Sequence, residues 1–242
     1  MRWNLRPILL LLLGLLALGG CRRPSPPLAP EPPSPPPVNA PPKPPGLLVS
    51  GFWNTWGLSL AECLRAHRAR QGEACRGALG ITVKKSSRRM VVTCDGIPVK
   101  GYFIALGRDP QGPKQRRGDG RTPEGTYYLW GKNWQSRFYL SLGVSYPNPT
   151  DAARGLRQGL ISPTMQQRIA SACARQAKPP QHTRLGGNIF IHGGGIGEVV
   201  RRGARKYVRI RDWTAGCVAL RNADMEELLA LLPVGIPVRI LP

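Results

Sequence analysis

Three segments between residues 80 and 106 decide the fold class: Gly80-Ile-Thr-Val-Lys84, Arg89-Met-Val-Val-Thr-Cys94 and Pro98-Val-Lys-Gly-Tyr-Phe-Ile-Ala-Leu106. The first and third alternate between apolar and polar residues, and the second is rich in β-branched residues, as expected of β-strands. Asp95-Gly96 separates the second from the third, and this dipeptide favours a two-residue hairpin turn. We therefore expect a β-rich domain that begins near residue 80.

Later segments extend this pattern to the end of the chain. Strands are expected at 125–130, 136–142, 188–192 and 237–241, and helices at 58–69, 151–158, 163–176 and 222–232. Ser59, Ser162 and Asn222 are the candidate N-caps of three of these helices. The stretch between residues 195 and 212 is basic and irregular. The predicted fold class is mainly β, sandwich-like, with a few peripheral helices.

The first 20 residues have the features of a secretory signal peptide, with a basic start, an apolar run and small residues before residue 21. Leu18-Gly19-Gly20-Cys21 resembles the bacterial lipobox, whose cysteine is lipidated and becomes the first mature residue. We expect Cys21 to carry a lipid anchor on an exported, membrane-bound protein facing the periplasm or cell wall. A chance cysteine after an ordinary signal peptide is the alternative. Arg22, in place of a retaining Asp, favours the outer membrane.

Residues 21–46 are expected to form a lipid-anchored, proline-rich linker. Of the 26 prolines in the chain, 13 lie between residues 24 and 46, and such a segment favours an extended polyproline conformation. A spacer is preferred over a recognition ligand, because no flanked Pro-x-x-Pro motif is present. A small helical element over 47–79 then leads into the domain at 80–242.

The formal net charge of the chain is +22. Without Arg2 and Arg6 of the signal peptide, 33 basic residues face 13 acidic ones, which leaves +20. Such a charge attracts polyanions and anionic surfaces. For an exported protein these are wall polymers and phospholipid headgroups, so no nucleic-acid partner is expected.

Six cysteines have different expected roles. Cys63, Cys75, Cys94 and Cys173 form an even set in an oxidising compartment, so two disulfides are predicted. Four cysteines allow three connectivities, of which Cys63–Cys75 is preferred because the two flank a polar, glycine-containing turn. No cysteine or histidine spacing indicates a metal site, and no cofactor is expected.

The predicted strand at 188–192 delivers His192 into a glycine-rich turn, and Cys217 follows 25 residues later. A thiol with its ordinary pKa of about 8.5 is a poor nucleophile near neutrality, so it needs a neighbouring base. Gly216 leaves the backbone open for main-chain N–H groups to face an oxyanion. The residues alone also allow a purely structural role, with Cys217 as a small buried hydrophobe.

Three motifs resemble the signatures of the L,D-transpeptidase catalytic domain, the YkuD fold: Thr122-Pro-Glu-Gly-Thr-Tyr127, Ile191-His192-Gly193 and Thr214-Ala-Gly-Cys-Val218. The resemblance runs from about residue 81 to 240. Further agreement with the YafK-like branch lies in Gly112-Pro-Lys-Gln115, Gly118-Asp-Gly120 and Asp212-Trp-Thr214.

The resemblance implies an activity on peptidoglycan stem tetrapeptides. Cys217 is expected to attack the carbonyl of the third residue, a diamino acid, and form a thioester, with His192 as general base and acid. The N–H groups of Gly216 and Cys217 would hold the oxyanion, and the Gly193 carbonyl would orient His192. The expected substrate-binding residues are Asp212, Trp213, Thr214 and Arg221.

Two positions depart from the pattern of many relatives. Ala215 stands where these have His, and Ala219 stands where they have a substrate-holding Arg, so that Arg221 is the nearest basic substitute. The thioester can pass to an amine, which gives cross-linking or protein attachment, or to water. Water would make the protein an L,D-carboxypeptidase or an amidase that releases a wall-bound lipoprotein. A non-catalytic wall-binding module is a further alternative.

Overall fold

The structure is a computed structural model that describes residues 57–71, 77–203 and 205–242. The expected signal peptide, Cys21 and the proline-rich linker lie outside the described residues, as does the first part of the 47–79 element. Within the described part, none of the helices has the length and apolar character needed to cross a bilayer.

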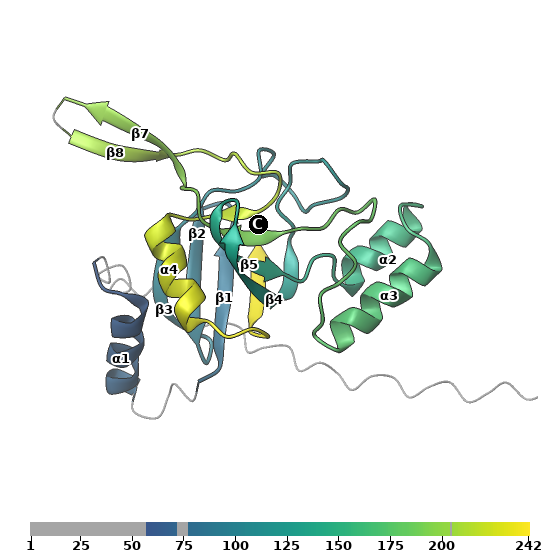
Figure 1. Ribbon diagram of the computed structural model, residues 1–242, viewed down its shortest axis with the longest axis horizontal. Coiled ribbons are helices and arrows are strands. Elements are labelled where there is room, and N and C mark those ends of the chain that lie inside the picture. Colours follow the sequence, from purple (N-terminus) through teal and green to yellow (C-terminus); the bar gives the residue numbers. More distant parts are fainter. Residues whose placement is uncertain (1–56, 72–76, 204) are drawn as a thin grey trace, which may run out of the picture. The chain divides into compact units, whose positions relative to one another are not determined.

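Eight strands form one sheet, which places the fold in the predicted mainly β class (Figure 1). In sheet order they are β3 (Ile97–Phe103), β2 (Arg89–Cys94), β1 (Leu79–Lys84), β10 (Pro237–Leu241), β4 (Gly125–Ser136), β5 (Tyr139–Val144), β6 (Phe190–His192) and β9 (Val218–Ala219). Most neighbours are antiparallel, and the β1–β10 and β6–β9 pairs are parallel. The chain end therefore lies in the middle of the sheet.

The sheet closes on itself just beyond its two edge strands. Ala105, two residues past β3, exchanges both backbone hydrogen bonds with Ala219 of β9, at 2.9 and 2.8 Å. Both alanines are fully buried, because only a small side chain fits where the two edges meet. This closure brings the segment after β3 against the loop that carries Cys217.

The first strands follow the sequence pattern. Ile81 and Val83 of β1 are buried, and they join the large apolar core on the inner face of the sheet. Asp95 and Gly96 both have positive φ, 49° and 81°, as a two-residue turn that follows the twist of its strands requires. The predicted hairpin is confirmed.

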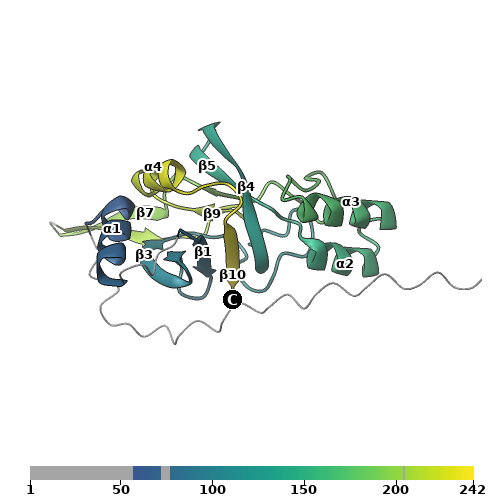
Figure 2. The same ribbon diagram turned by 90° about the horizontal axis from the view of Figure 1, so that it is seen from below.

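Four helices flank the sheet: α1 (Leu60–Gln71), α2 (Pro149–Arg157), α3 (Pro163–Ala174) and α4 (Asn222–Leu231). Figure 2 shows α2 and α3 side by side, well away from α1 and α4. Ser59 and Ser162 accept N–H bonds from the first turns of α1 and α3, which confirms them as N-caps.

Asn222 is not an N-cap, contrary to prediction. Arg221 occupies that position without a side-chain cap, and the Asn222 side chain instead accepts the Gly194 N–H at 2.8 Å. The amide therefore ties the start of α4 to the glycine turn that follows His192.

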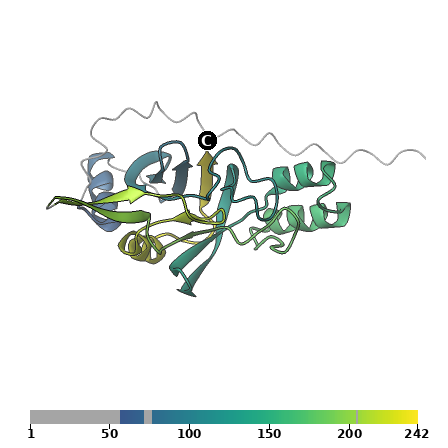
Figure 3. The same cartoon turned by 90° about the horizontal axis from the view of Figure 1, so that it is seen from above.

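The stretch predicted to be irregular forms a separate two-stranded hairpin, β7 (Gly197–Arg202) and β8 (Arg205–Ile210). Figure 3 shows it projecting from the rest of the domain. Val199 pairs with Val208 in this hairpin, and both side chains are exposed. The strands have no core to face, which is why the sequence shows no burial pattern.

The preferred Cys63–Cys75 disulfide is wrong. Cys63 is a buried thiol that packs beside Leu60 in the main core, because α1 turns this side chain toward the sheet. Cys173 is also a thiol, so the four cysteines do not form two disulfides. Cys94 is disulfide-bonded, and its partner is not among the described cysteines.

Candidate active site

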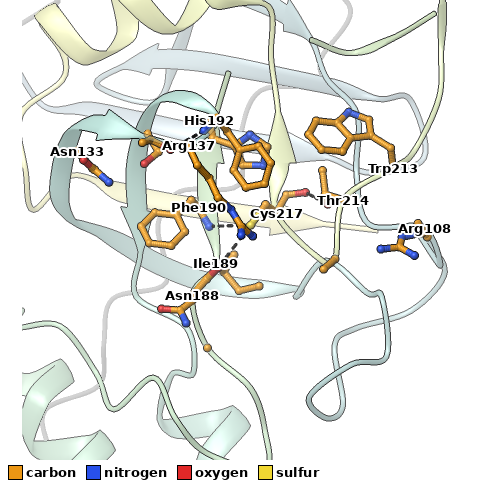
Figure 4. Close-up of a pocket in the computed structure, with 15 residues that line it drawn as sticks. Arg108, Asn133, Arg137, Asn188, Ile189, Phe190, His192, Trp213, Thr214 and Cys217 are labelled. Atoms are coloured by element: carbon orange, nitrogen blue, oxygen red, sulfur yellow. Dashed lines mark hydrogen bonds between the residues drawn. The ribbon is translucent and has the colours of Figure 1, made fainter. Parts of the chain in front are cut away.

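A cavity of about 670 Å³ lies between the β4–β5 turn, the segment before β6 and the loop before β9. Figure 4 shows that Cys217 and His192 both lie on its wall. The sequence placed these residues 25 positions apart, and the parallel pairing of β6 with β9 brings them together, since Ile191 pairs with Val218 and His192 with Ala219.

His192 stands at the end of β6 with almost no exposed surface. Its Nδ1 lies 2.6 Å from the Gly193 carbonyl oxygen, the group that the sequence analysis proposed as its acceptor. A carbonyl only accepts, so Nδ1 carries the proton and Nε2 is left with a free lone pair. Burial lowers the pKa of His192, which favours the neutral, basic ring.

Two aromatic rings fix the orientation of the imidazole. Phe138 stacks on it with ring centroids 4.6 Å apart, and Trp213 contacts it edge-on at 5.6 Å. The Trp213 indole N–H donates to the Gly195 carbonyl at 3.1 Å. Trp213, expected to bind substrate, therefore both lines the cavity and holds the base.

The Cys217 sulfur is half-buried and has two backbone neighbours. It accepts the Phe190 N–H at 3.4 Å, and its thiol faces the Asn188 carbonyl at 3.5 Å. Burial raises the pKa of Cys217, although the Phe190 N–H and the nearby positive charges oppose this shift. The resting pair is therefore a neutral thiol and a neutral imidazole.

The loop before Cys217 is held by the hydroxyl of Thr214. This oxygen accepts the Gly216 N–H at 3.1 Å and donates to the Cys217 carbonyl at 2.7 Å. The Gly216 N–H is thus occupied within the loop and is not directed at the cavity, in contrast to its expected oxyanion role. Thr214 lines the cavity, and its hydroxyl also braces this loop.

Gly216 is required for the shape of this loop. Its φ is +134°, and a Cβ atom there would lie 2.5 Å from the Arg121 carbonyl oxygen. Arg121 belongs to the segment that carries the motifs at 112–127, so this segment packs directly under the nucleophile loop. Lys85 also holds the 112–127 segment in place, since its buried ammonium donates to the carbonyls of Gly112 and Thr122.

Asp212 and Arg221, expected to bind substrate, do not line the cavity. Asp212 pairs with Arg88 at 2.7 Å and accepts the Leu106 N–H at 2.8 Å. Arg221 makes two bonds of 2.8 Å to Asp224 in the first turn of α4. Asp212 thus holds the backbone at Leu106, and the Arg221 guanidinium is engaged by Asp224.

Two arginines on the cavity wall, Arg108 and Arg137, were not predicted from the sequence. Arg137 lies in the turn between β4 and β5, and its guanidinium is 4.7 Å from the Phe138 ring centroid. Neither arginine belongs to a motif, so only the folded arrangement reveals them. No Asp or Glu lines this cavity, which makes it electropositive.

In the part of the chain described, no cluster of three His, Cys, Asp or Glu side chains could hold a metal ion. The chemistry on the cavity wall is that of a thiol beside an oriented, neutral imidazole.

Residues 79–240 match the family described as "YkuD: L,D-transpeptidase catalytic domain". The chain belongs to this family. The match covers nearly all of the described sheet, including the strand that ends in His192 and the loop that carries Cys217. No curated protein matches the chain.

Several solved structures are similar to this YkuD-family chain. The helical cell shape determining protein Pgp2 of Campylobacter jejuni (K307A mutant) is 23% identical, with a TM-score of 0.42 over 67% of this chain and 46% of that one. Bd1075 of Bdellovibrio bacteriovorus is 20% identical, with a TM-score of 0.38 over 68% and 48%. An L,D-transpeptidase of Mycobacterium smegmatis is 12% identical, with a TM-score of 0.36 over 68% and 59%. The chain spans about half the length of these proteins.

Proposed function

We propose that this chain is a cysteine acyltransferase that acts on peptidoglycan stem tetrapeptides through a thioester on Cys217. One observation carries the proposal: the Cys217 thiol and the His192 imidazole share one cavity, with the imidazole held in the tautomer that can accept a proton. Membership of the YkuD family supports the substrate class.

In the proposed reaction, the Cys217 sulfur attacks the carbonyl of the third residue while its proton passes to Nε2 of His192. Since burial favours the neutral thiol and the neutral imidazole, proton transfer accompanies the attack rather than preceding it. The bond to the fourth residue then breaks, and its amine leaves with the proton from the imidazolium. The acyl group remains on sulfur.

The second half of the reaction depends on the acceptor. An amine from another stem or a protein gives a transferase, with His192 taking the proton of the attacking amine. Water gives an L,D-carboxypeptidase, or an amidase when the substrate is a wall-bound lipoprotein. The chemistry at Cys217 is the same in each case, so we propose transfer as the main reaction and hydrolysis as the alternative.

The test is incubation of the purified protein with muropeptides, followed by mass spectrometry of the products. Transfer predicts dimers linked between two third residues, whereas tripeptides alone would establish hydrolysis. Cys217→Ala should abolish both products. Cys173→Ala is the matched control, since it removes a part-buried thiol that does not line the cavity.

A non-catalytic wall-binding protein predicts a different outcome. It would bind muropeptides, leave their masses unchanged and tolerate Cys217→Ala without loss of function. Products that depend on Cys217 would exclude this alternative.

We further propose that the protein is exported and anchored to a membrane, with the outer membrane favoured, through a lipid on Cys21. The support is the lipobox-like Leu18-Gly19-Gly20-Cys21 after an apolar run. Cys21→Ser should abolish labelling by a fatty-acid probe and release the protein from the membrane fraction. Unchanged membrane retention would contradict the anchor.

A further inference from the structure

The turn between β4 and β5 places a cation at the thiol. Figure 4 shows the Arg137 side chain extending from this turn toward Cys217, below His192. Its positive charge also acts on the pKa of both groups, in addition to the larger effect of burial. The guanidinium therefore acts electrostatically on both reacting side chains.

The position of Arg137 is coupled to that of the base. Its guanidinium lies 4.7 Å from the Phe138 ring centroid, and Phe138 stacks on His192 at 4.6 Å. A cation over an aromatic face is attracted by the ring quadrupole. Phe138 thus contacts both the Arg137 guanidinium and the His192 imidazole, so the positions of these two groups are linked through its ring.

Arg137 has no anionic partner within the described residues. Several other cations near the site are paired, as in Lys85–Glu124, Arg88–Asp212 and Lys114–Asp119. Arg137 is exposed to the cavity, and the cavity wall contains no carboxylate. The N–H groups of the Arg137 guanidinium are thus available to hydrogen-bond a ligand in the cavity.

Three other candidates for this role differ from Arg137. Arg108 also lines the cavity, but Figure 4 shows it beyond Thr214, farther from Cys217 than Arg137 in this view. Arg221 is bound to Asp224. Position 219 holds an alanine, which is buried against Ala105 where the sheet closes and supplies no cation. The β4–β5 turn supplies the cation instead.

We infer that Arg137 is a specificity residue that receives the terminal carboxylate of the donor peptide. The inference rests on the proposed function, in which the departing fourth residue carries that carboxylate. One residue spans only about 3.3–3.6 Å of extended chain, so a guanidinium beside the sulfur reaches the carboxylate when the scissile carbonyl is at the sulfur. Guanidinium and carboxylate match in a two-bond, charge-assisted geometry. The site therefore selects peptides that end with a free carboxylate immediately after the scissile bond.

Binding to the Cys217→Ala protein tests this without catalysis. Two stem tetrapeptides are compared by calorimetry, one ending in a free carboxylate and one in a C-terminal amide. We expect the carboxylate form to bind about tenfold or more tightly, and Arg137→Ala to reduce this preference to about twofold or less. Arg137→Lys keeps the charge but not the fork, so it should retain only part of the preference.

Arg168→Ala is the charge-matched control, because Arg168 is exposed on α3 and does not line the cavity; it should keep the full preference. Equal binding of the two peptides, a preference that survives Arg137→Ala, or an equal loss of affinity for both peptides would overturn the inference. A preference that depends on Arg137, in a protein whose Cys217 forms no thioester, would support this inference and contradict the proposed function. Failure of the inference about Arg137 can therefore be distinguished from failure of the proposed function.

Discussion

The Thr214 hydroxyl donates to the carbonyl of Cys217 at 2.7 Å while accepting the N–H of Gly216 at 3.1 Å. A single buried side chain thus holds both residues of the Gly-Cys pair. The shape of the nucleophile loop depends on this hydroxyl rather than on the backbone alone.

Thr214→Val should slow acylation of Cys217 by about tenfold or more, because the isosteric side chain leaves two backbone groups without partners. Each unmade bond costs about 1–3 kcal/mol where the group is buried. Single-turnover kinetics and urea unfolding measure the two effects, and Thr214→Ser should restore both. An unchanged acylation rate in Thr214→Val would show that the loop keeps its shape without the hydroxyl.

Gly216→Ala should destabilise the fold by at least about 2 kcal/mol, through the positive φ and the close approach of the new carbon to the Arg121 carbonyl. Gly118→Ala is the control, since Gly118 also has a positive φ, +81°, but open space around it; its cost should be about 1 kcal/mol. Similar unfolding free energies for the two variants would argue against the close contact.

The pH dependence of alkylation should report a neutral resting pair. Burial raises the pKa of Cys217 above its ordinary value and lowers that of His192 below its ordinary value. The rate of reaction with iodoacetamide, which requires thiolate, should therefore still increase at pH 9. A plateau reached below pH 7 would instead indicate a preformed thiolate–imidazolium pair.

Asp212→Ala should lower stability without weakening substrate binding. The change leaves Arg88 and the Leu106 N–H without their partner, at a cost of about 1–3 kcal/mol. The dissociation constant of the tetrapeptide should stay within about twofold of the parent value. Asp212→Asn keeps an acceptor for Leu106 and should lose less stability. Weaker peptide binding at full stability would return Asp212 to the substrate site.

The strands and most caps could be predicted because their signals are local. Burial of Ile81 and Val83 gives β1 its alternation, and the Asp95-Gly96 turn follows from backbone sterics at two adjacent positions. His192 and Cys217 could be paired because each belongs to a family motif. The Gly193 carbonyl could be named as acceptor because it adjoins the ring that it orients.

The missed features depend on contacts between distant segments. Arg137 lies in a turn with no motif, and it reaches the cavity only because the β4–β5 hairpin forms part of the cavity wall. Asn222 has the composition of a cap, yet its amide is used by Gly194, 28 positions earlier. Thr214 and Asp212 were expected to bind substrate, but the contacts of their side chains follow from how the loop packs on the segments containing Leu106 and Arg88.

The most direct measurement is the intact mass of the protein after brief incubation with a stem tetrapeptide. The account predicts a mass increase equal to the tetrapeptide minus the free amino acid that leaves, which is the tripeptide minus one water, located by fragmentation at Cys217. The adduct should be absent in Cys217→Ala and strongly reduced in His192→Ala, while His182→Ala, an exposed histidine outside the cavity, should form it normally. An unmodified parent protein, or an adduct that persists in Cys217→Ala, would contradict the assignment of Cys217 as the nucleophile.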